Sequence, residues 1–221
     1  MVDLESLIGD IMTPPSNGWH CRCGEPIGHP GVCDRCAQRY DRQRAESHRG
    51  DCRSTIPFRF RWAQFDEPLL VERCGSAPVR TARALLDQLG GELDCIVFHG
   101  AAGSGKTSLA CACLRHAIDE LPGLGFSGRY ASALEVSAAM RDHDSAQVSL
   151  AKSASVLVLD DVGQERFPDA VREVIHARHD AGRPMLITTF LAQDALLDRM
   201  GAGTERRLFE RAAVVQMGGR P

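Results

Sequence analysis

The sequence predicts an α/β fold in which helices cover both faces of a mostly parallel sheet, preceded by a small cysteine-rich module. Two patterns predict the sheet: apolar runs of strand length alternate with helical segments through the second half of the chain, and a glycine-rich stretch joins the first of these strands to a helix. Four cysteines within residues 19–36 predict the module.

Length and composition agree with this division. A chain of 221 residues accommodates one domain of about 150 residues and a small appendage. With 43% hydrophobic and 25% charged residues, the chain is close to the globular average, which argues against a disordered or fibrous protein. The formal net charge of −3 provides no overall attraction to nucleic acid, so such contact requires a local basic patch.

The N-terminus and the cysteine count indicate a cytoplasmic protein without membrane contact. No apolar run approaches the roughly 20 residues of a membrane span, and the acidic start lacks the basic region of a secretory signal. In a reducing cytosol, nine cysteines are better explained by metal ligation and burial than by disulfides.

The elements are expected in the following order. Apolar positions at helical spacing predict a helix over residues 4–12, ended by Pro14, and arginine-rich residues 35–61 are interpreted as a basic linker interrupted by Gly50 and Pro57. Strands are predicted at 94–100, 128–131, 155–161, 184–189 and 212–217, and helices at 106–120, 132–141 and 168–180.

The cysteine cluster predicts a structural zinc site. Cys21-x-Cys23 and Cys33-x2-Cys36 have the close spacing of pairs that converge on one tetrahedral ion. Four thiolates leave no position open for water, which favours a structural over a catalytic role. Because Cys-x-Cys is a tighter pair than usual, His20, His29 and Cys52 remain alternative ligands. The alternative to a zinc site is a cluster of buried free thiols.

GAAGSGKT at residues 100–107 fills every fixed position of the phosphate-binding G-x-x-x-x-G-K-T pattern and lies between a predicted strand and helix. It predicts ATP binding, with Lys106 on the β- and γ-phosphates and the Thr107 hydroxyl on Mg²⁺. Lys106 is one of only two lysines among 26 basic residues, which suits a compact charge in a crowded pocket. The predicted nucleotide-binding residues are Gly100, Ala101, Ala102, Gly103, Ser104, Gly105, Lys106, Thr107, Ser108 and Asp160.

VLVLDD at residues 156–161 is a buried strand that ends in two carboxylates, at the sheet edge where α/β proteins bind ligands. We expect Asp160 to hold Mg²⁺ and Asp161 to polarise the attacking water. The next predicted strand ends in Thr188 and Thr189, either of which is a candidate for positioning that water, with Thr188 assigned to catalysis; threonine is equally an ordinary strand residue.

Two arginine-containing stretches admit more than one interpretation. FRFRW at residues 58–62 has the composition of a stacking surface for single-stranded nucleic acid and the alternation of an edge strand, but packing or a lid over the base is favoured. In TERRLFER at residues 204–211, one arginine could stabilise the γ-phosphate of a neighbouring subunit, or the helix face could simply be solvated.

The order of these motifs resembles the AAA+ helicase loaders of the DnaC/DnaI type and their relatives, the IstB-like transposition helper ATPases. The resemblance covers residues 56–221 and includes Asp160, Asp161 and Gly163 in the acidic motif. It implies a P-loop NTPase fold without a C-terminal lid, and it places Arg207 at the trans-acting arginine finger, with Arg206 as the fallback. Phe190 stands where the family usually has asparagine, which implies slow or altered hydrolysis.

The resemblance also implies a function and partners. Residues 1–53 are expected to form a helix, zinc module and basic linker that dock on a replicative helicase, and residues 54–221 an ATPase domain that binds single-stranded DNA and oligomerises with ATP. The expected role is loading of that helicase in replication initiation, in a bacterium or phage. The alternatives are a transposition helper and an ATP-switched DNA-binding adaptor with little hydrolysis.

Overall fold

The computed structural model describes residues 16, 18–121 and 127–218. The chain divides into two compact units, Met1–Ser47 and His48–Pro221, which are described separately. The helix expected at residues 4–12 lies outside the described residues. Within the described ranges, no helix combines the length and apolar character needed to cross a membrane.

The first unit contains a short hairpin. Strands β1 (Trp19–His20) and β2 (Pro26–Ile27) pair antiparallel. The tight turn between them is closed by two backbone hydrogen bonds, from Cys21 N to Glu25 O and from Gly24 N to Cys21 O, each 2.8 Å long. The turn therefore holds Cys21 and Cys23 close together on one loop.

Helix α2 (Asp34–Ser54) occupies most of the segment that was expected to be a linker. Residues 34–49 contain neither glycine nor proline, and Asp34 and Arg53 at the two ends complement the helix dipole. The expected interruption at Gly50 was wrong, because one glycine inside a helix costs only about 1 kcal/mol.

The second unit is built on a five-stranded parallel sheet with the order β4-β5-β6-β3-β7. Every predicted strand is present, with shifts of one or two residues at some ends. The order matters for function because β6 lies between β3, which leads into the glycine-rich loop, and β5, which ends in the acidic pair. The strands are β3 (Cys95–Gly100), β4 (Arg129–Ser132), β5 (Leu157–Asp160), β6 (Met185–Thr189) and β7 (Ala212–Met217).

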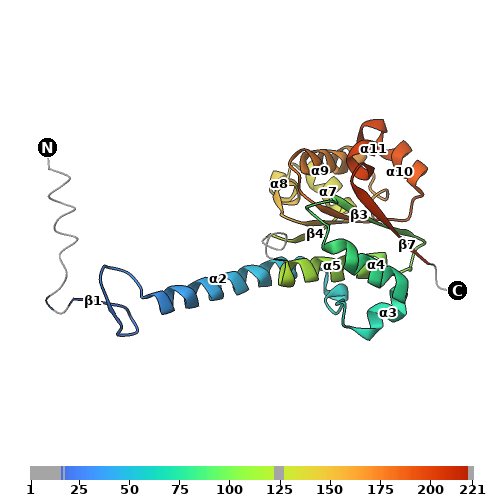
Figure 1. The fold of residues 1–221 in the computed structure, drawn as a ribbon. Helices are drawn as coiled ribbons and strands as arrows, with labels where there is room; N and C mark the ends of the chain where they lie inside the picture. Colours follow the sequence, from blue (N-terminus) through green and yellow to red (C-terminus); the bar gives the residue numbers. More distant parts are fainter. Residues whose placement is uncertain (1–15, 17, 122–126, 219–221) are drawn as a thin grey trace, which may run out of the picture. The chain divides into compact units, whose positions relative to one another are not determined.

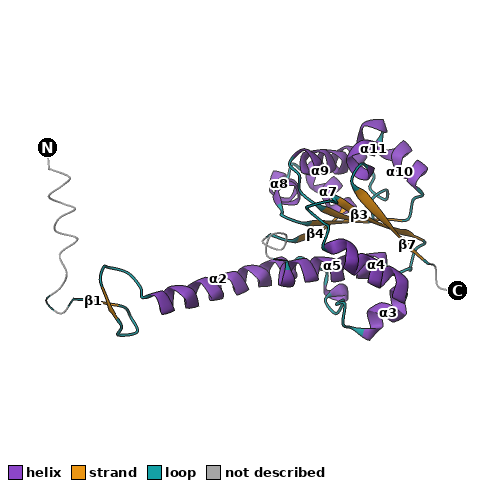
Figure 2. Cartoon of the chain, viewed as in Figure 1, coloured by secondary structure: helices purple, strands orange, loops and turns teal. Residues whose placement is uncertain are grey.

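Helices cover both faces of this sheet, as predicted (Figures 1 and 2). Helices α3, α4 and α5 lie on one face, and α7 to α11 lie on the other. Their bounds are α3 (Pro68–Cys74), α4 (Ser76–Leu86), α5 (Lys106–Glu120), α7 (Ala133–Arg141), α8 (Ser145–Ser153), α9 (Pro168–Asp180), α10 (Gln193–Met200) and α11 (Ala202–Phe209).

Alternate residues of each central strand belong to different hydrophobic cores. In β3, Ile96 and Phe98 pack with α4 and α5, whereas Cys95 and Val97 pack on the side of α9. Since both faces of the strands are buried, the sequence shows continuous apolar runs rather than alternation. The sheet is thus rigid where its carboxyl ends carry the polar groups described next.

Candidate functional site

The carboxyl ends of β3, β6 and β5 border a cavity of about 620 Å³. The glycine-rich loop follows β3 and Asp161 follows β5, and both line this cavity across the end of β6. The cavity is lined by Arg59, Phe60, Arg73, Ala102, Gly103, Gly105, Lys106, Thr107, Ser108, Asp161, Gln164 and Phe190.

The glycine-rich loop needs glycine for its backbone geometry. Gly105 is the N-cap of α5 with φ of 88°, in the left-handed region that other residues avoid. A Cβ atom there would lie 2.6 Å from the Cys74 sulfur of α3. The loop thereby presents the N-terminus of a 15-residue helix to the cavity, a site suited to phosphate.

Lys106 is buried at the start of α5. Its Nζ donates hydrogen bonds of 2.8 Å to the carbonyl oxygens of Gly100 and Ala101, so the ammonium folds back onto the loop that precedes it. Burial lowers the pKa of Lys106, although Asp161 and Asp160 act in the opposite direction. The buried Ser104 hydroxyl has no hydrogen-bond partner among the described residues, so this loop has a polar group that is available to bind a ligand.

Asp160 is held by hydroxyl groups from three different elements. Its Oδ1 accepts from Thr107 at 2.9 Å and from Thr188 at 2.6 Å, and its Oδ2 accepts from the Tyr130 hydroxyl at 2.7 Å. Burial, together with the charge of Asp160, raises the pKa of Tyr130, which keeps that hydroxyl a donor. The Thr107 and Asp160 oxygens form a hard-ligand pair that fits Mg²⁺.

Asp161 follows directly after β5, with φ of 57°, a conformation uncommon for a residue other than glycine. The bend directs this carboxylate to the cavity, while Asp160 stays buried behind it. Burial raises the pKa of the Asp161 carboxyl and the charge of Asp160 adds to the effect, whereas Lys106 and Arg59 oppose it.

The two threonines at the end of β6 have partners inside the protein. Thr188 donates to Asp160 and accepts from the backbone N–H of Asp161 at 2.8 Å. Thr189 donates to Val162 O at 2.8 Å. Both are buried and neither lines the cavity, whereas Phe190 does. The geometry therefore gives Thr188 a contact with the acidic pair; its assignment to catalysis stays a prediction.

The turn after Asp161 contains an acidic residue that sequence reasoning missed. Glu165 is fully buried, and its carboxylate accepts the Gly163 N–H at 2.8 Å and pairs with Arg199 Nε of α10 at 3.1 Å. Its burial depends on α10, which the sequence analysis did not predict.

The FRFRW segment forms the short 3-10 helix η1 (Phe58–Phe60), so the edge-strand alternative was wrong. Pro57, with φ of −54°, starts this turn and supplies no N–H for a strand ladder. Arg59 and Phe60 line the cavity, in keeping with the favoured packing or lid role, and Arg73 of α3 joins them. The Arg73 guanidinium lies 4.9 Å from the Trp62 ring centroid.

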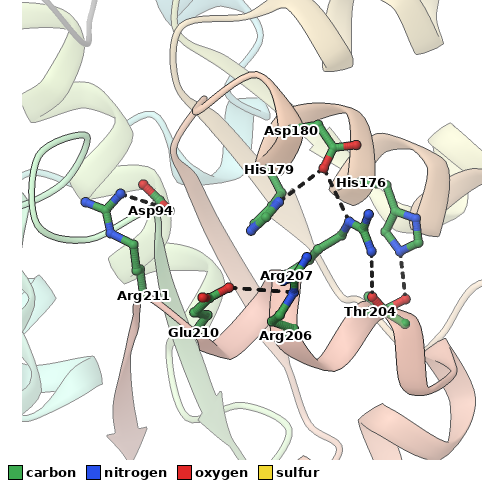
Figure 3. A network of polar contacts seen from close by, with 10 residues as sticks. Asp94, His176, His179, Asp180, Thr204, Arg206, Arg207, Glu210 and Arg211 are labelled. Carbon is green, nitrogen blue, oxygen red and sulfur yellow. Dashed lines mark hydrogen bonds and ion pairs between the residues drawn. The ribbon is translucent and has the colours of Figure 1, made fainter.

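Arg207 belongs to a polar network between α9 and α11 (Figure 3). Its Nε contacts Asp180 at 3.4 Å and its guanidinium donates to Gly203 O at 2.9 Å. Arg206 is more exposed, at 69% of its side chain, and forms a weak pair with Glu210 at 3.8 Å. Neither arginine lines the cavity, so a role in hydrolysis requires a second subunit.

The four predicted zinc ligands converge. The sulfurs of Cys21, Cys23, Cys33 and Cys36 all lie within 4.8 Å of one another, and Cys23 and Cys33 are 3.6 Å apart. Zinc–sulfur bonds of about 2.3 Å place tetrahedral ligands about 3.8 Å apart, so the cluster fits the ion. Hydrogen bonding from the Cys23 backbone lowers the pKa of Cys21 to about 6, and hydrogen bonding with the Cys21 thiol raises that of Cys36 to about 12.

The alternative zinc ligands have other surroundings. His20 and His29 each place Nδ1 at 3.2 Å from a backbone carbonyl, of Gly18 and Pro30 respectively. Cys52 is buried in the hydrophobic core of the second unit. The described geometry therefore favours the four-cysteine set.

Comparison with solved structures identifies the fold. A DnaC helicase loader aligns with a TM-score of 0.58 and 22% identity over 73% of this chain and 100% of that chain. The chain has the AAA+ fold. DnaI aligns with a TM-score of 0.55 and 16% identity over 70% of this chain and 96% of that one. The replication initiator DnaA, bound to AMPPCP and single-stranded DNA, aligns with a TM-score of 0.58 and 21% identity over 75% of this chain.

The AAA+ similarity is structural. No protein-family model and no curated protein matches the sequence. The chain spans 51% of the length of the two DnaA chains that contain AMPPCP. The expected AAA+ fold and the resemblance to DnaC and DnaI loaders are thus confirmed at the level of architecture.

Proposed function

We propose that the second unit is an ATPase domain that binds ATP with Mg²⁺ in the cavity at the carboxyl edge of the sheet. One observation carries the proposal: Lys106 and Asp161 line one cavity, while Thr107 and Asp160 hydrogen-bond to each other at 2.9 Å. These are the charge and oxygen ligands that a triphosphate with its metal requires. The AMPPCP bound in the structurally similar DnaA supports the nucleotide assignment.

The chain's own residues divide the chemistry among them. The backbone N–H groups at the start of α5 and the Lys106 ammonium bind phosphate oxygens. Thr107 and Asp160 hold Mg²⁺, which when bound neutralises charge on the β- and γ-phosphates. Asp161 accepts a hydrogen bond from the attacking water and takes up its proton. Arg59 and Phe60 also line the cavity, and we assign the base to their side of it.

Hydrolysis in this proposal requires a neighbouring subunit. The cavity is lined by Arg59 and Arg73, whereas none of the α11 side chains that the structure describes lines it. We assign the trans-acting role to Arg207, which must leave or share its contact with Asp180 to reach a γ-phosphate. Oligomerisation is therefore expected to depend on ATP.

The first unit is proposed to dock on a replicative helicase, which the ATPase domain then loads onto single-stranded DNA. The similarity of the second unit to a DnaC helicase loader and to DnaI supports this assignment. The four-cysteine cluster supports a zinc-stabilised docking module. The DNA-bound DnaA supports contact with single strands.

The experiment is capture of purified bacterial replicative helicase by the full chain, followed by loading onto circular single-stranded DNA. We expect the zinc-loaded protein to capture the helicase and to increase its unwinding with ATP, and a Cys33→Ser, Cys36→Ser variant to lose both. Absence of capture by the zinc-loaded protein would overturn the loader assignment. Capture of a transposase instead would favour the transposition helper.

A second candidate is an adaptor in which ATP acts as a switching ligand with little turnover. Phe190 favours it, because this apolar side chain lines the cavity where a polar group at the end of β6 would face the nucleotide. Steady-state ATP hydrolysis separates the two candidates. A loader ATPase hydrolyses ATP, whereas the adaptor binds DNA in an ATP-dependent manner with little hydrolysis.

A further inference from the structure

We propose that Gln164 orients the attacking water at the γ-phosphate end of the cavity, a task that the end of β6 cannot perform in this protein. The inference rests on the proposed ATPase function.

The end of β6 offers no free polar side chain. The Thr188 hydroxyl donates to Asp160 and accepts from the Asp161 backbone, at 2.6 and 2.8 Å. The Thr189 hydroxyl donates to Val162 O and accepts from Leu191 N, at 2.8 and 3.1 Å. Phe190, which does line the cavity, has no hydrogen-bonding group in its side chain.

Gln164 supplies the missing chemistry from the neighbouring turn. Among the described residues that line the cavity it is the only carboxamide, and it lies three positions after Asp161. Its backbone N–H donates to Asp161 O at 3.2 Å, which closes a tight turn and keeps the two residues adjacent. Gln164 is exposed, and it lines the same cavity as Lys106 and Thr107.

The turn that carries Gln164 is held from several sides. Val162 N donates to Thr188 O of β6 at 2.9 Å, and Gly163 N donates to the buried Glu165 carboxylate at 2.8 Å. Gly163 has φ of 103°, and a Cβ on it would lie 2.4 Å from Leu191. Arg199 of α10 fixes Glu165 in turn. The backbone that carries Gln164 is thus fixed before substrate binds, which favours catalysis by a group on this turn.

A carboxamide suits this position because it both accepts and donates hydrogen bonds. Its oxygen accepts from the water, while its NH₂ group donates to a γ-phosphate oxygen. The water oxygen forms a bond to the γ-phosphorus as the bond to the bridging oxygen breaks. ADP leaves with that electron pair, and Asp161 takes the water proton. A glutamine in other nucleotide hydrolases orients water in this manner.

The test compares Gln164→Ala with Gln193→Ala, a matched change at an exposed glutamine of α10 outside the cavity. We expect Gln164→Ala to lower kcat about 100-fold with KM changed less than about threefold, and Gln193→Ala to match wild type. Binding of AMPPCP should be unchanged, and binding of ADP with aluminium fluoride, which mimics the transition state, should weaken by a similar factor.

A second variant keeps the proposal falsifiable if loss of activity has another cause. Phe190→Asn restores a carboxamide at the end of β6, so adding it to Gln164→Ala should recover at least tenfold of the lost kcat. Wild-type kcat in Gln164→Ala would overturn the role of Gln164, and so would equal losses of AMPPCP and aluminium fluoride binding. Absence of hydrolysis by the wild type above an Asp161→Asn control would instead contradict the ATPase proposal.

Discussion

The Thr188 hydroxyl donates a hydrogen bond to Asp160 Oδ1 over 2.6 Å, from one strand of the sheet to its neighbour. The Thr188 hydroxyl oxygen also accepts a hydrogen bond from the backbone N–H of Asp161 at 2.8 Å. One side chain thus fixes both the carboxylate proposed to hold Mg²⁺ and the bend that directs the next carboxylate into the cavity. We therefore expect Thr188 to position the two carboxylates rather than to contact the attacking water.

We expect Thr188→Val to lower the free energy of unfolding by about 2 kcal/mol, because a buried charge-assisted hydrogen bond is lost and the Asp161 N–H is left unpaired. Affinity for Mg²⁺ with ATP should fall about tenfold. Chemical denaturation and metal titration measure the two effects, and Thr188→Ser should behave as wild type. Unchanged stability and metal affinity combined with lost hydrolysis would point to contact with water instead.

Tyr130 provides a test with an internal control, since the chain has only two tyrosines. Tyr130→Phe removes the 2.7 Å hydrogen bond to Asp160 Oδ2. We expect an increase of about tenfold in the Mg²⁺ concentration needed for half-maximal ATP binding, as for other groups that orient a metal ligand. Tyr40→Phe, on exposed α2, should leave this concentration unchanged. Equal behaviour of the two variants would contradict the role given to Tyr130.

The cysteine cluster predicts one zinc ion per chain, measured by elemental analysis of the purified protein. Cys36→Ser should reduce the zinc content to a small fraction, because a structural site needs all four ligands. His29→Asn should retain the full content, since His29 contacts a backbone carbonyl. Full zinc content in Cys36→Ser together with loss of zinc in His29→Asn would show that His29, and not Cys36, is the fourth ligand.

Arg207 and Arg206 form a natural pair for testing the trans-acting arginine. We expect Arg207→Ala to lower ATP turnover by about 10³-fold and Arg206→Ala to have little effect, while both variants bind ATP normally. Mixing Arg207→Ala with Lys106→Ala should restore some turnover, because each lacks a different half of the shared site. The reverse ranking would assign the role to the more exposed Arg206.

Local sequence patterns predicted the five strands of the parallel sheet and helices α5, α7 and α9, but they missed α3, α4, α8 and α10. Helices α5 and α9 and strand β7 begin and end at the predicted residues, because apolar periodicity, Pro168 and the glycine-rich loop mark their limits. The structure of residues 35–61 was harder to predict, since a run of arginines is compatible with both coil and helix. In the structure, α2 occupies most of this segment.

The site could be predicted only as far as its motifs reach. The glycine-rich loop and the acidic pair each carry a recognisable spacing, and the loop and Asp161 border the cavity. The contacts of Tyr130 and Glu165 depend on which strand or helix lies beside them. Local hydrophobic periodicity does not determine strand order, so these contacts could not be predicted. Arg178, which belongs to no motif of the sequence, is buried in α9 and donates to carbonyl oxygens of Ala151, Ala154 and Pro184.

The most direct measurement is steady-state ATP hydrolysis with Mg²⁺ by the wild type, Asp161→Asn and Lys106→Ala, each with and without single-stranded DNA. We predict turnover by the wild type that rises with DNA, background rates in both variants, and ATP binding retained by Asp161→Asn but lost in Lys106→Ala. Wild-type turnover no greater than that of Asp161→Asn, under either condition, would contradict the account.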